Sequence, residues 1–387
     1  MIGTSPISAQ IVDEQGQYVD TVFHDNVDRT AEDFVIASLL VADPGTYMYS
    51  VLGHACLRLQ CPAFGMDYCF TYESEDESKK VLSFLAGKLM MGLFAIPTET
   101  YCAFYREEGR GVCEYKLNLP IEAKRELWRI LDENLARNTR LPYDYYHRGC
   151  AITAQNFVQE ALGTRRIVYD QSLYEESFNA REIWIEATTK ALWVRFIALF
   201  IMGSETSSPL KGEKKLLVPN DLVLAWQKAT VNGEPLLASE PIVLVEGEPQ
   251  IADVWFTPMV LAVILFVLAI ANLFWNRPYF DWLMLVAQTF VGCGMTYLIV
   301  FSDLCCTEWN WLFIPFNPLP AIFWRWRKYW ALPCAVVLMI WSIVMSVVFI
   351  WGHALEDWSQ IVMVVAWMVV LLKQYENYKC IKIFIFK

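Results

Sequence analysis

Long apolar runs dominate the last third of the chain. Residues 257–275, 282–301 and 332–351 are each about 20 residues long and contain no charged side chain. A helix of that length crosses a hydrocarbon core of about 30 Å. The pattern therefore predicts three transmembrane helices in this region.

Two further apolar runs are weaker, because residues 309–324 contain three prolines and residues 358–372 are short. If both cross the membrane, the basic residues of this region fall on one side and the acidic residues on the other, as the positive-inside rule requires. The basic set is Arg277, Arg325, Arg327, Lys328, Lys373, Lys379, Lys382 and Lys387, and the acidic set is Asp303, Glu308, Glu356 and Asp357. We therefore expect five helices over residues 251–387, with the C-terminus in the cytoplasm and residues 1–250 on the other side.

An exported N-terminal domain needs a signal, yet the first 30 residues contain no continuous apolar region. We expect the export signal to be absent from this sequence.

Shorter periodic runs in the N-terminal half predict an α+β domain with a core over residues 34–165. Strand-like runs lie near residues 34–41, 54–60 and 67–73. Apolar residues at helical spacing follow Pro120 and predict one helix. A second helix is predicted from Cys150 to about Leu162, where Gly163 is a typical helix stop.

Residues 166–250 are predicted to be an interfacial and connector segment. Within it, the run 192–202 carries Arg195 and is too short to span. It suits a helix lying on the membrane surface, and a buried core helix is the alternative. Residues 203–250, rich in Ser, Pro, Lys and Glu, are expected to form a loop-rich connector.

Composition agrees with one soluble domain joined to a membrane domain. The chain has 387 residues, of which 56% are hydrophobic and 15% aromatic. Its net charge of −11 argues against a nucleic-acid partner, because phosphate binding needs a basic surface.

The candidate chemistry lies in His54, on a predicted strand, and Cys150, at a predicted helix start. A cysteine in the first helical turn feels the positive end of the helix dipole, which favours the nucleophilic thiolate. Structural roles for both residues are the alternative, and His24 and His147 compete as bases.

The remaining cysteines give no metal signature. No pair among Cys56, Cys61, Cys69, Cys102, Cys113 and Cys150 has C-x-x-C spacing, so we expect no metal site. The first five form one or two disulfides or stay as free buried thiols.

Several short motifs follow one another in a familiar order. They are Ser50, Gly53-His54-Ala55, Arg58, Asp67 to Tyr72, Gly87-Lys88-Leu89, Tyr105-Arg106, Arg110, Glu114, Leu117-Asn118-Leu119, Glu133-Asn134, Tyr143 to Tyr146, Cys150, Gly203, Leu217 to Pro219 and Phe316-Asn317-Pro318-Leu319. As a set they resemble the lipoprotein N-acyltransferase Lnb family.

The resemblance implies a permuted papain-like (NlpC/P60-like) fold, with histidine before cysteine, joined to C-terminal transmembrane helices. It implies an inner-membrane protein whose periplasmic catalytic domain moves a fatty acyl chain from a phospholipid to the α-amine of a diacylglyceryl-cysteine lipoprotein, without a cofactor. The chain departs from the family at Arg148-Gly149, where Asp-Asn is usual, and at Ile152-Thr153, where Thr-Arg is usual.

By motif match, Cys150 is the expected nucleophile and His54 the general base. The strand 67–73 offers Tyr72 or Glu73 to orient the base, depending on register, and Tyr72 is the family-matching position. The expected substrate-binding residues are Ser50, Arg58, Arg110, Tyr143, Tyr146 and Asn317.

Other classes stay open. A membrane-anchored cysteine amidase or peptidase would use the same dyad, and so would a lipid hydrolase. A non-enzymatic membrane scaffold would need neither residue.

Overall fold

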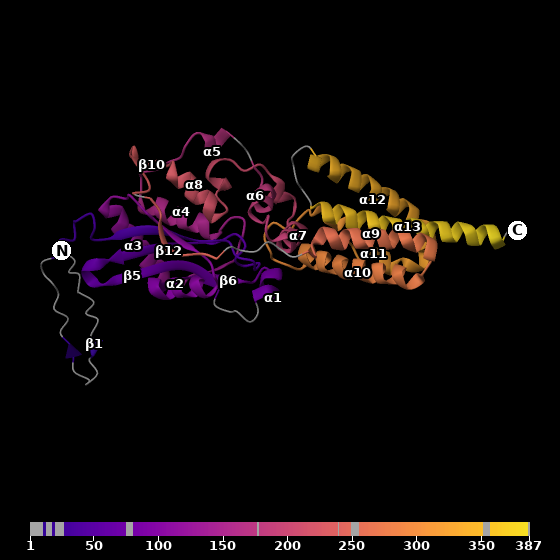
Figure 1. Ribbon diagram of the computed structural model, residues 1–387, viewed down its shortest axis with the longest axis horizontal. Helices are drawn as coiled ribbons and strands as arrows, with labels where there is room; N and C mark the ends of the chain where they lie inside the picture. The colour runs from indigo at the N-terminus through magenta and orange to yellow at the C-terminus, as the bar shows by residue number, and fades with distance from the viewer. Residues whose placement is uncertain are drawn as a thin grey trace.

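The computed structural model describes residues 11–12, 18–19, 27–74, 80–175, 178–238, 240–248, 255–350 and 357–385. His24, Glu356, Lys387 and most of the stretch inspected for an export signal lie outside these residues. Two bodies follow one another along the molecule, a mixed sheet-and-helix domain and a helical bundle (Figure 1). The fold is therefore α+β fused to an all-α membrane part, as the sequence predicted.

A seven-stranded antiparallel sheet forms the centre of the first domain, in the order β12-β7-β3-β4-β5-β6-β8. The predicted strands correspond to β3 (Ile36–Ala42), β4 (His54–Cys61) and β5 (Met66–Ser74). The other strands are β6 (Met90–Pro97), β7 (Val112–Lys116), β8 (Arg140–Pro142) and β12 (Ile242–Val245). β4 is the middle strand, so the histidine that begins it stands at one end of the central strand.

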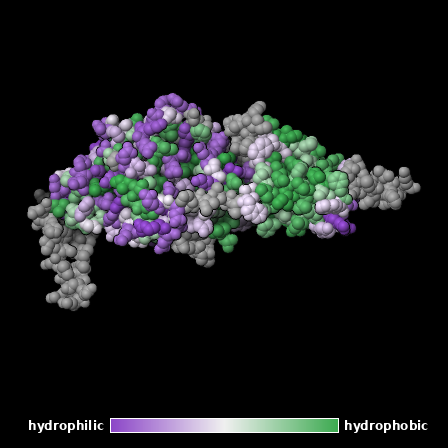
Figure 2. All heavy atoms as spheres, in the orientation of Figure 1, coloured by the Kyte–Doolittle hydropathy of each residue, from purple (hydrophilic) through white to green (hydrophobic). Residues whose placement is uncertain are grey.

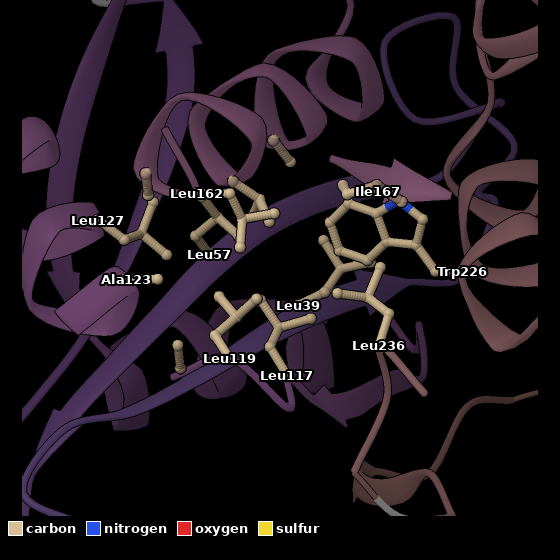
Figure 3. Packing of buried hydrophobic residues seen from close by; sticks show 14 of the residues in the cluster. Leu39, Leu57, Leu117, Leu119, Ala123, Leu127, Leu162, Ile167, Trp226 and Leu236 are labelled. Carbon is tan, nitrogen blue, oxygen red and sulfur yellow. The ribbon is translucent and has the colours of Figure 1, made fainter. Parts of the chain in front are cut away.

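Helices cover both faces of the sheet. One face packs against α3 (Ile121–Arg137), α4 (Cys150–Ala161) and α8 (Pro219–Gln227). Figure 3 shows this core, where Leu57 of β4 lies among Leu127, Leu162 and Trp226. The other face packs against α2 (Thr98–Glu107) and includes Cys56 of β4. Alternate residues of β4 therefore serve two separate cores.

The prediction that residues 203–250 form only a connector is wrong. β12 pairs with β7 at the edge of the main sheet, and Trp226 of α8 is completely buried in its core. These elements are short and lie between polar residues, so their apolar positions give no clear helix or strand period in the sequence. The other short elements are β1 (Ile11–Val12), β2 (Tyr18–Val19), α1 (Lys80–Leu85), β9 (Ile167–Val168), α5 (Ser172–Glu175), α6 (Ala180–Ala187), β10 (Thr230–Val231) and β11 (Glu234–Pro235), with single 3₁₀ turns at Pro62–Phe64, Ser204–Ser207 and Gly212–Lys215.

Cysteine pairing follows one of the two expected alternatives. The ten cysteines from Cys56 to Cys334 are free thiols, including the five N-terminal to Cys150.

α7 (Leu192–Ile201) lies where the two bodies meet (Figure 1). It buries Leu199 and leaves Ile197 exposed. Arg195 pairs with Asp357 at the start of α13 at 3.0 Å. This helix is therefore tied to the start of α13, and its placement on the membrane surface stays a prediction.

Four helices in the described residues are long and apolar enough to cross a membrane. They are α9 (Pro258–Trp275), α10 (Pro278–Val300), α12 (Arg327–Ile350) and α13 (Trp358–Ile385). Their outer surface is a continuous hydrophobic region on the face that Figure 2 shows. These helices confirm four of the five predicted spans as apolar helices.

The fifth predicted helix, residues 309–324, is wrong as a helix. It is broken into short turns at Trp311–Phe313, α11 (Leu319–Ile322) and Trp324–Trp326. Its prolines remove backbone donors and clash with the preceding helical turn. The distribution of charged residues could not reveal the break. That distribution depends on the side of the membrane at which a segment ends, and not on whether its backbone is helical.

The broken segment nevertheless runs back along α10. Just before the segment, the Thr307 hydroxyl donates to the carbonyl oxygen of Leu298, near the end of α10. At the end of the segment, the ring centre of Trp324 lies 6.1 Å from that of Trp282, near the start of α10. In between, Gln288 Nε2 donates to the carbonyl oxygens of Pro315 at 3.2 Å and Asn317 at 2.7 Å. The side chain of Gln288 thus satisfies carbonyls that an irregular backbone would leave unpaired in an apolar setting.

Gly292 makes this close return possible. A Cβ added there would lie 2.6 Å from the carbonyl carbon of Asn317, whereas a Cβ at Gly294 on the same helix would meet nothing within 4 Å. We predict that Gly292→Ala lowers stability by about 1–3 kcal/mol, as overpacking does. Gly294→Ala should leave it unchanged or slightly raise it, because alanine favours the helix.

Thermal unfolding of both variants in one detergent tests this pair. Equal melting temperatures would contradict the close packing of the broken segment on α10.

Candidate active site

Cys150 begins α4, and the turn before it is shaped by Asp144. Asp144 Oδ1 accepts hydrogen bonds from the backbone N–H groups of Tyr146 at 3.0 Å and His147 at 2.8 Å. α4 then packs on the central strand, and the backbone N–H groups of Ala55 and Ala151 are directed toward the Cys150 sulfur, where they favour its thiolate. The thiol therefore lies where the helix start meets β4.

His54 begins β4 directly after Gly53. Gly53 has a φ of +80°, and a Cβ there would lie 2.7 Å from the carbonyl oxygen of Ala42, so a larger residue would displace the histidine. His54 Nε2 lies 2.7 Å from Thr71 Oγ1, which donates in turn to Glu73 Oε1 at 3.1 Å.

This chain of bonds determines which ring nitrogen carries the proton. A threonine hydroxyl has one hydrogen. Because Thr71 donates it to Glu73, Thr71 accepts from His54 and the proton lies on Nε2. Nδ1 is then the unprotonated, basic nitrogen.

His54 and Cys150 occupy the same end of the central strand. The Ala55 amide that is directed toward the Cys150 sulfur belongs to the residue after His54 in the chain. Arg110 acts electrostatically on both side chains. No hydrogen bond joins imidazole and thiol in the described residues. The two side chains approach this end of β4 from different faces, since His54 bonds Thr71 whereas Cys150 packs with the core that contains Tyr72.

Both groups are neutral near pH 7. Burial, helped by the positive charge of Arg110, lowers the pKa of His54 to about 4. Burial also raises the pKa of the Cys150 thiol above its usual value of 9.0, although backbone hydrogen bonds and Arg110 oppose the shift. The resting pair is therefore a thiol and an imidazole rather than an ion pair.

Arg110 is a buried cation with spare hydrogen-bonding capacity. Its Nε donates to the carbonyl of Asp43 at 2.7 Å, its Nη1 to Glu108 at 2.8 Å, and its guanidinium lies 4.7 Å from the ring centre of Tyr105. Its Nη2 is buried and has no hydrogen-bond partner among the described residues. A buried donor of this kind is suited to an anionic ligand or a developing negative charge.

An apolar cluster connects the site to the membrane domain. Tyr143 and Tyr146, in the turn before Cys150, pack in one cluster with Leu199 of α7 and with Leu298 and Leu304 at the end of α10. Cys305 Sγ also donates to Asp144 Oδ1 at 3.2 Å. The loop after α10 thus supports the turn that leads into Cys150.

Two glycines bring the backbones of the two domains together. A Cβ on Gly87 would overlap the backbone of Asp303 and Leu304, and one on Gly203 would overlap the backbone of Thr307 and Glu308. Gly203 N–H donates to Cys306 O at 2.6 Å, and Ser204 N–H donates to Glu308 O at 3.1 Å. The loop 302–308 is therefore held by main-chain bonds rather than by side chains alone.

The other predicted site residues are more scattered. Ser50 is buried near Arg110, since both would contact a Cβ on Gly45. Arg58 is bonded to Asp67 and Glu114 on the α2 face. Their substrate-binding roles stay predictions.

Tyr72 and Asn317 lie away from His54. Tyr72 packs on the opposite face from Thr71 and Glu73, with the α3 and α4 core. Asn317 lies beside Gly292, in the middle of α10. Thr71, which sequence reasoning passed over, is the hydrogen-bond partner of His54.

His147, a competing base, points elsewhere. Its Nδ1 lies 2.9 Å from Asp144 Oδ2 and its Nε2 lies 3.6 Å from Glu205 Oε1.

Comparison with family models gives two matches, in chain order. Residues 27–171 match the Lnb N-terminal periplasmic domain, and residues 250–382 match the Lnb transmembrane domain. The chain belongs to the Lnb family. It is therefore an Lnb-type lipoprotein-maturation protein with a periplasmic N-terminal domain and a C-terminal membrane domain. No curated protein and no solved structure matches it.

The neutral resting pair predicts how Cys150 reacts with iodoacetamide. Because the thiolate is the nucleophile and the thiol pKa lies above 9.0, alkylation should be slow at neutral pH and should accelerate above about pH 9. Mass spectrometry of the peptide containing Cys150, sampled over time at each pH, measures the rate. A high rate that does not change between about pH 5 and pH 8 would indicate a thiolate–imidazolium pair instead.

Proposed function

We propose that this Lnb-family protein is an inner-membrane lipoprotein N-acyltransferase. Its thiol takes a fatty acyl chain from a phospholipid and passes it to the α-amine of a diacylglyceryl-cysteine lipoprotein. The observation that carries the proposal is the apolar cluster that links the turn before Cys150 to α7 and the end of α10. Withdrawing an acyl chain from the bilayer costs about 0.8 kcal/mol per CH₂, so a lipid donor favours a thiol held at the membrane.

In the first half-reaction, His54 Nδ1 takes the Cys150 proton and the sulfur attacks the ester carbonyl. The oxyanion is received by N–H groups at the start of α4, where Cys150 and Ala151 have no intrahelical acceptor. Collapse breaks the ester C–O bond, and His54 returns the proton to the leaving alcohol of the lysophospholipid. The acyl chain is left as a thioester on Cys150.

In the second half-reaction, the lipoprotein amine attacks the thioester. His54 accepts a proton from the attacking nitrogen and delivers it to the departing sulfur, which restores the thiol. The product is an amide, and no redox partner or cofactor is needed. Water must be excluded while the thioester waits, and Tyr143 and Tyr146 are suited to that task because they belong to the apolar cluster.

Arg110 is the strongest of the proposed substrate-binding residues. Its charge acts on both His54 and Cys150, and its buried, unpartnered Nη2 is suited to the donor phosphate. We propose less direct roles in substrate binding for Ser50, which lies beside Arg110, and for Arg58 and Asn317, which lie farther away.

The proposal predicts an acyl-enzyme. Incubation with a phospholipid of defined chain length, without lipoprotein, should add one acyl group to the intact mass, and a lipopeptide with a free α-amine should then remove it. Cys150→Ala should form no adduct, and His54→Ala should slow its formation by about 100-fold or more.

An N-acetylated lipopeptide is the matched control, because it offers the same lipid and peptide without the nucleophile. It should leave the adduct intact. If buffer discharges the adduct as fast as the amine does, the protein is a lipid hydrolase. If His54→Ala acylates at the wild-type rate, the base is misassigned.

Thr71 is proposed as a positioning residue that holds the His54 ring with Nδ1 toward the thiol. Thr71→Val should lower kcat by about tenfold, part of the 10²–10⁴ that a general base contributes. Thr71→Ser, which keeps the hydroxyl, should restore most of it. Tyr72→Phe is the competing test: if it costs more than Thr71→Val and serine rescues nothing, Tyr72 is the orienting group, as the family match predicted.

A further inference from the structure

We infer that the protein binds one Zn²⁺ ion through His147, Glu205 and Cys306, at the junction of the periplasmic and membrane domains. These three residues each offer one ligand atom, and the three atoms lie within 4.8 Å of one another. They come from three separate segments: the turn before Cys150, the 3₁₀ turn Ser204–Ser207, and the loop after α10. Sequence spacing could not reveal such a site, because the ligands are 58 and 101 residues apart in the chain.

The separations suit a tetrahedral ion. Zinc lies about 2.0–2.3 Å from N, O and S ligands, so ligand atoms around it are roughly 3.3–3.8 Å apart. His147 Nε2 and Glu205 Oε1 are already 3.6 Å apart. The remaining approach needed of Cys306 Sγ is at most about 1.5 Å, within the reach of a side-chain adjustment.

His147 is oriented from behind by Asp144. Its Nδ1 bonds Asp144 Oδ2 at 2.9 Å, which leaves Nε2 facing Glu205. A carboxylate behind a histidine in this way is the usual second partner of a zinc ligand. Asp144 is itself fixed by the backbone N–H groups of Tyr146 and His147, so the imidazole is held before any ion binds.

Cys306 and Glu205 are held together by the backbone. The bonds from Gly203 to Cys306 and from Ser204 to Glu308 pair the two segments that carry them. Cys306 has a φ of +58°, an unusual conformation for a residue with a side chain. It is 7% exposed, whereas His147 and Glu205 reach solvent, so the ion has a soft ligand inside and an open route outside.

Binding balances charge at this position. The Cys306 thiol loses its proton to solvent, and thiolate plus carboxylate neutralise the two positive charges of the ion, with His147 neutral. Three protein ligands leave a fourth position for water. The ion would tie the turn that presents Cys150 to the loop of the membrane domain, so it would stabilise the junction without touching the reacting atoms.

The test uses the full-length protein in detergent, stripped with a chelator and then titrated with Co²⁺ or Zn²⁺. Wild type should bind one ion per chain and show thiolate-to-cobalt absorption, and Zn²⁺ should raise its melting temperature. Cys306→Ser should abolish the absorption. His147→Ala and Glu205→Gln should weaken binding by about 100-fold, and Asp144→Asn by about 10–100-fold.

Cys305→Ser is the matched control, because it removes the adjacent thiol but keeps a hydroxyl that can donate to Asp144, so binding and absorption should remain. If wild type binds no ion, or binds Co²⁺ without thiolate absorption, the proposal fails regardless of how the variants fold. It also fails if Cys305→Ser loses the absorption and Cys306→Ser keeps it. None of these readouts measures acyl transfer, so the outcome is independent of the proposed activity.

Discussion

The contact on which the rest of the structure depends is the main-chain docking of the loop 302–308 onto the periplasmic domain. Gly87 and Gly203 admit that loop at distances that no side chain would allow. The bonds from Gly203 and Ser204 then lock it in place. Because Cys305 reaches Asp144 from this loop, the same contact supports the turn before the nucleophile. The two glycines therefore have a physical reason: a side chain at either position would prevent the loop from approaching this closely.

Much of the fold could be predicted because single elements carry strong local signals. The helix from Cys150 ends where Gly163 adopts a left-handed φ of +63°, and β4 and β5 flank a tight turn at Gly65. The failures came where tertiary contacts decide the outcome. β12 is only four residues long and becomes a strand because β7 offers it an edge. The segment 309–324 loses its helix to prolines, and Gln288 compensates by bonding two of its carbonyls.

The site shows the same division. The strand position of His54 and the helix-start position of Cys150 could be predicted from local sequence, whereas their proposed roles rest on the family resemblance. The partner of His54 could not, since it depends on the register between β4 and β5, and one residue of slip exchanges the faces. The observed register pairs Leu57 with Phe70, which turns Thr71 and Glu73 to the His54 face and Tyr72 to the other. Arg110 lies on that face too. It follows α2 in the chain, and our sequence analysis did not predict that helix.

A neutral resting dyad fits a site beside lipid. Separating charge between thiolate and imidazolium in apolar surroundings costs several kcal/mol per ion unless both are well bonded. The His54–Thr71–Glu73 chain bonds one side of the imidazole before any substrate arrives, and the backbone N–H groups around Cys150 do the same for sulfur. In the proposed mechanism, proton transfer would then need the approach of His54 Nδ1 to the thiol. Under the proposed function, arrival of an acyl ester, whose developing oxyanion those N–H groups and Arg110 can stabilise, would make that transfer favourable, so the nucleophile would form when its target is present and not in its absence.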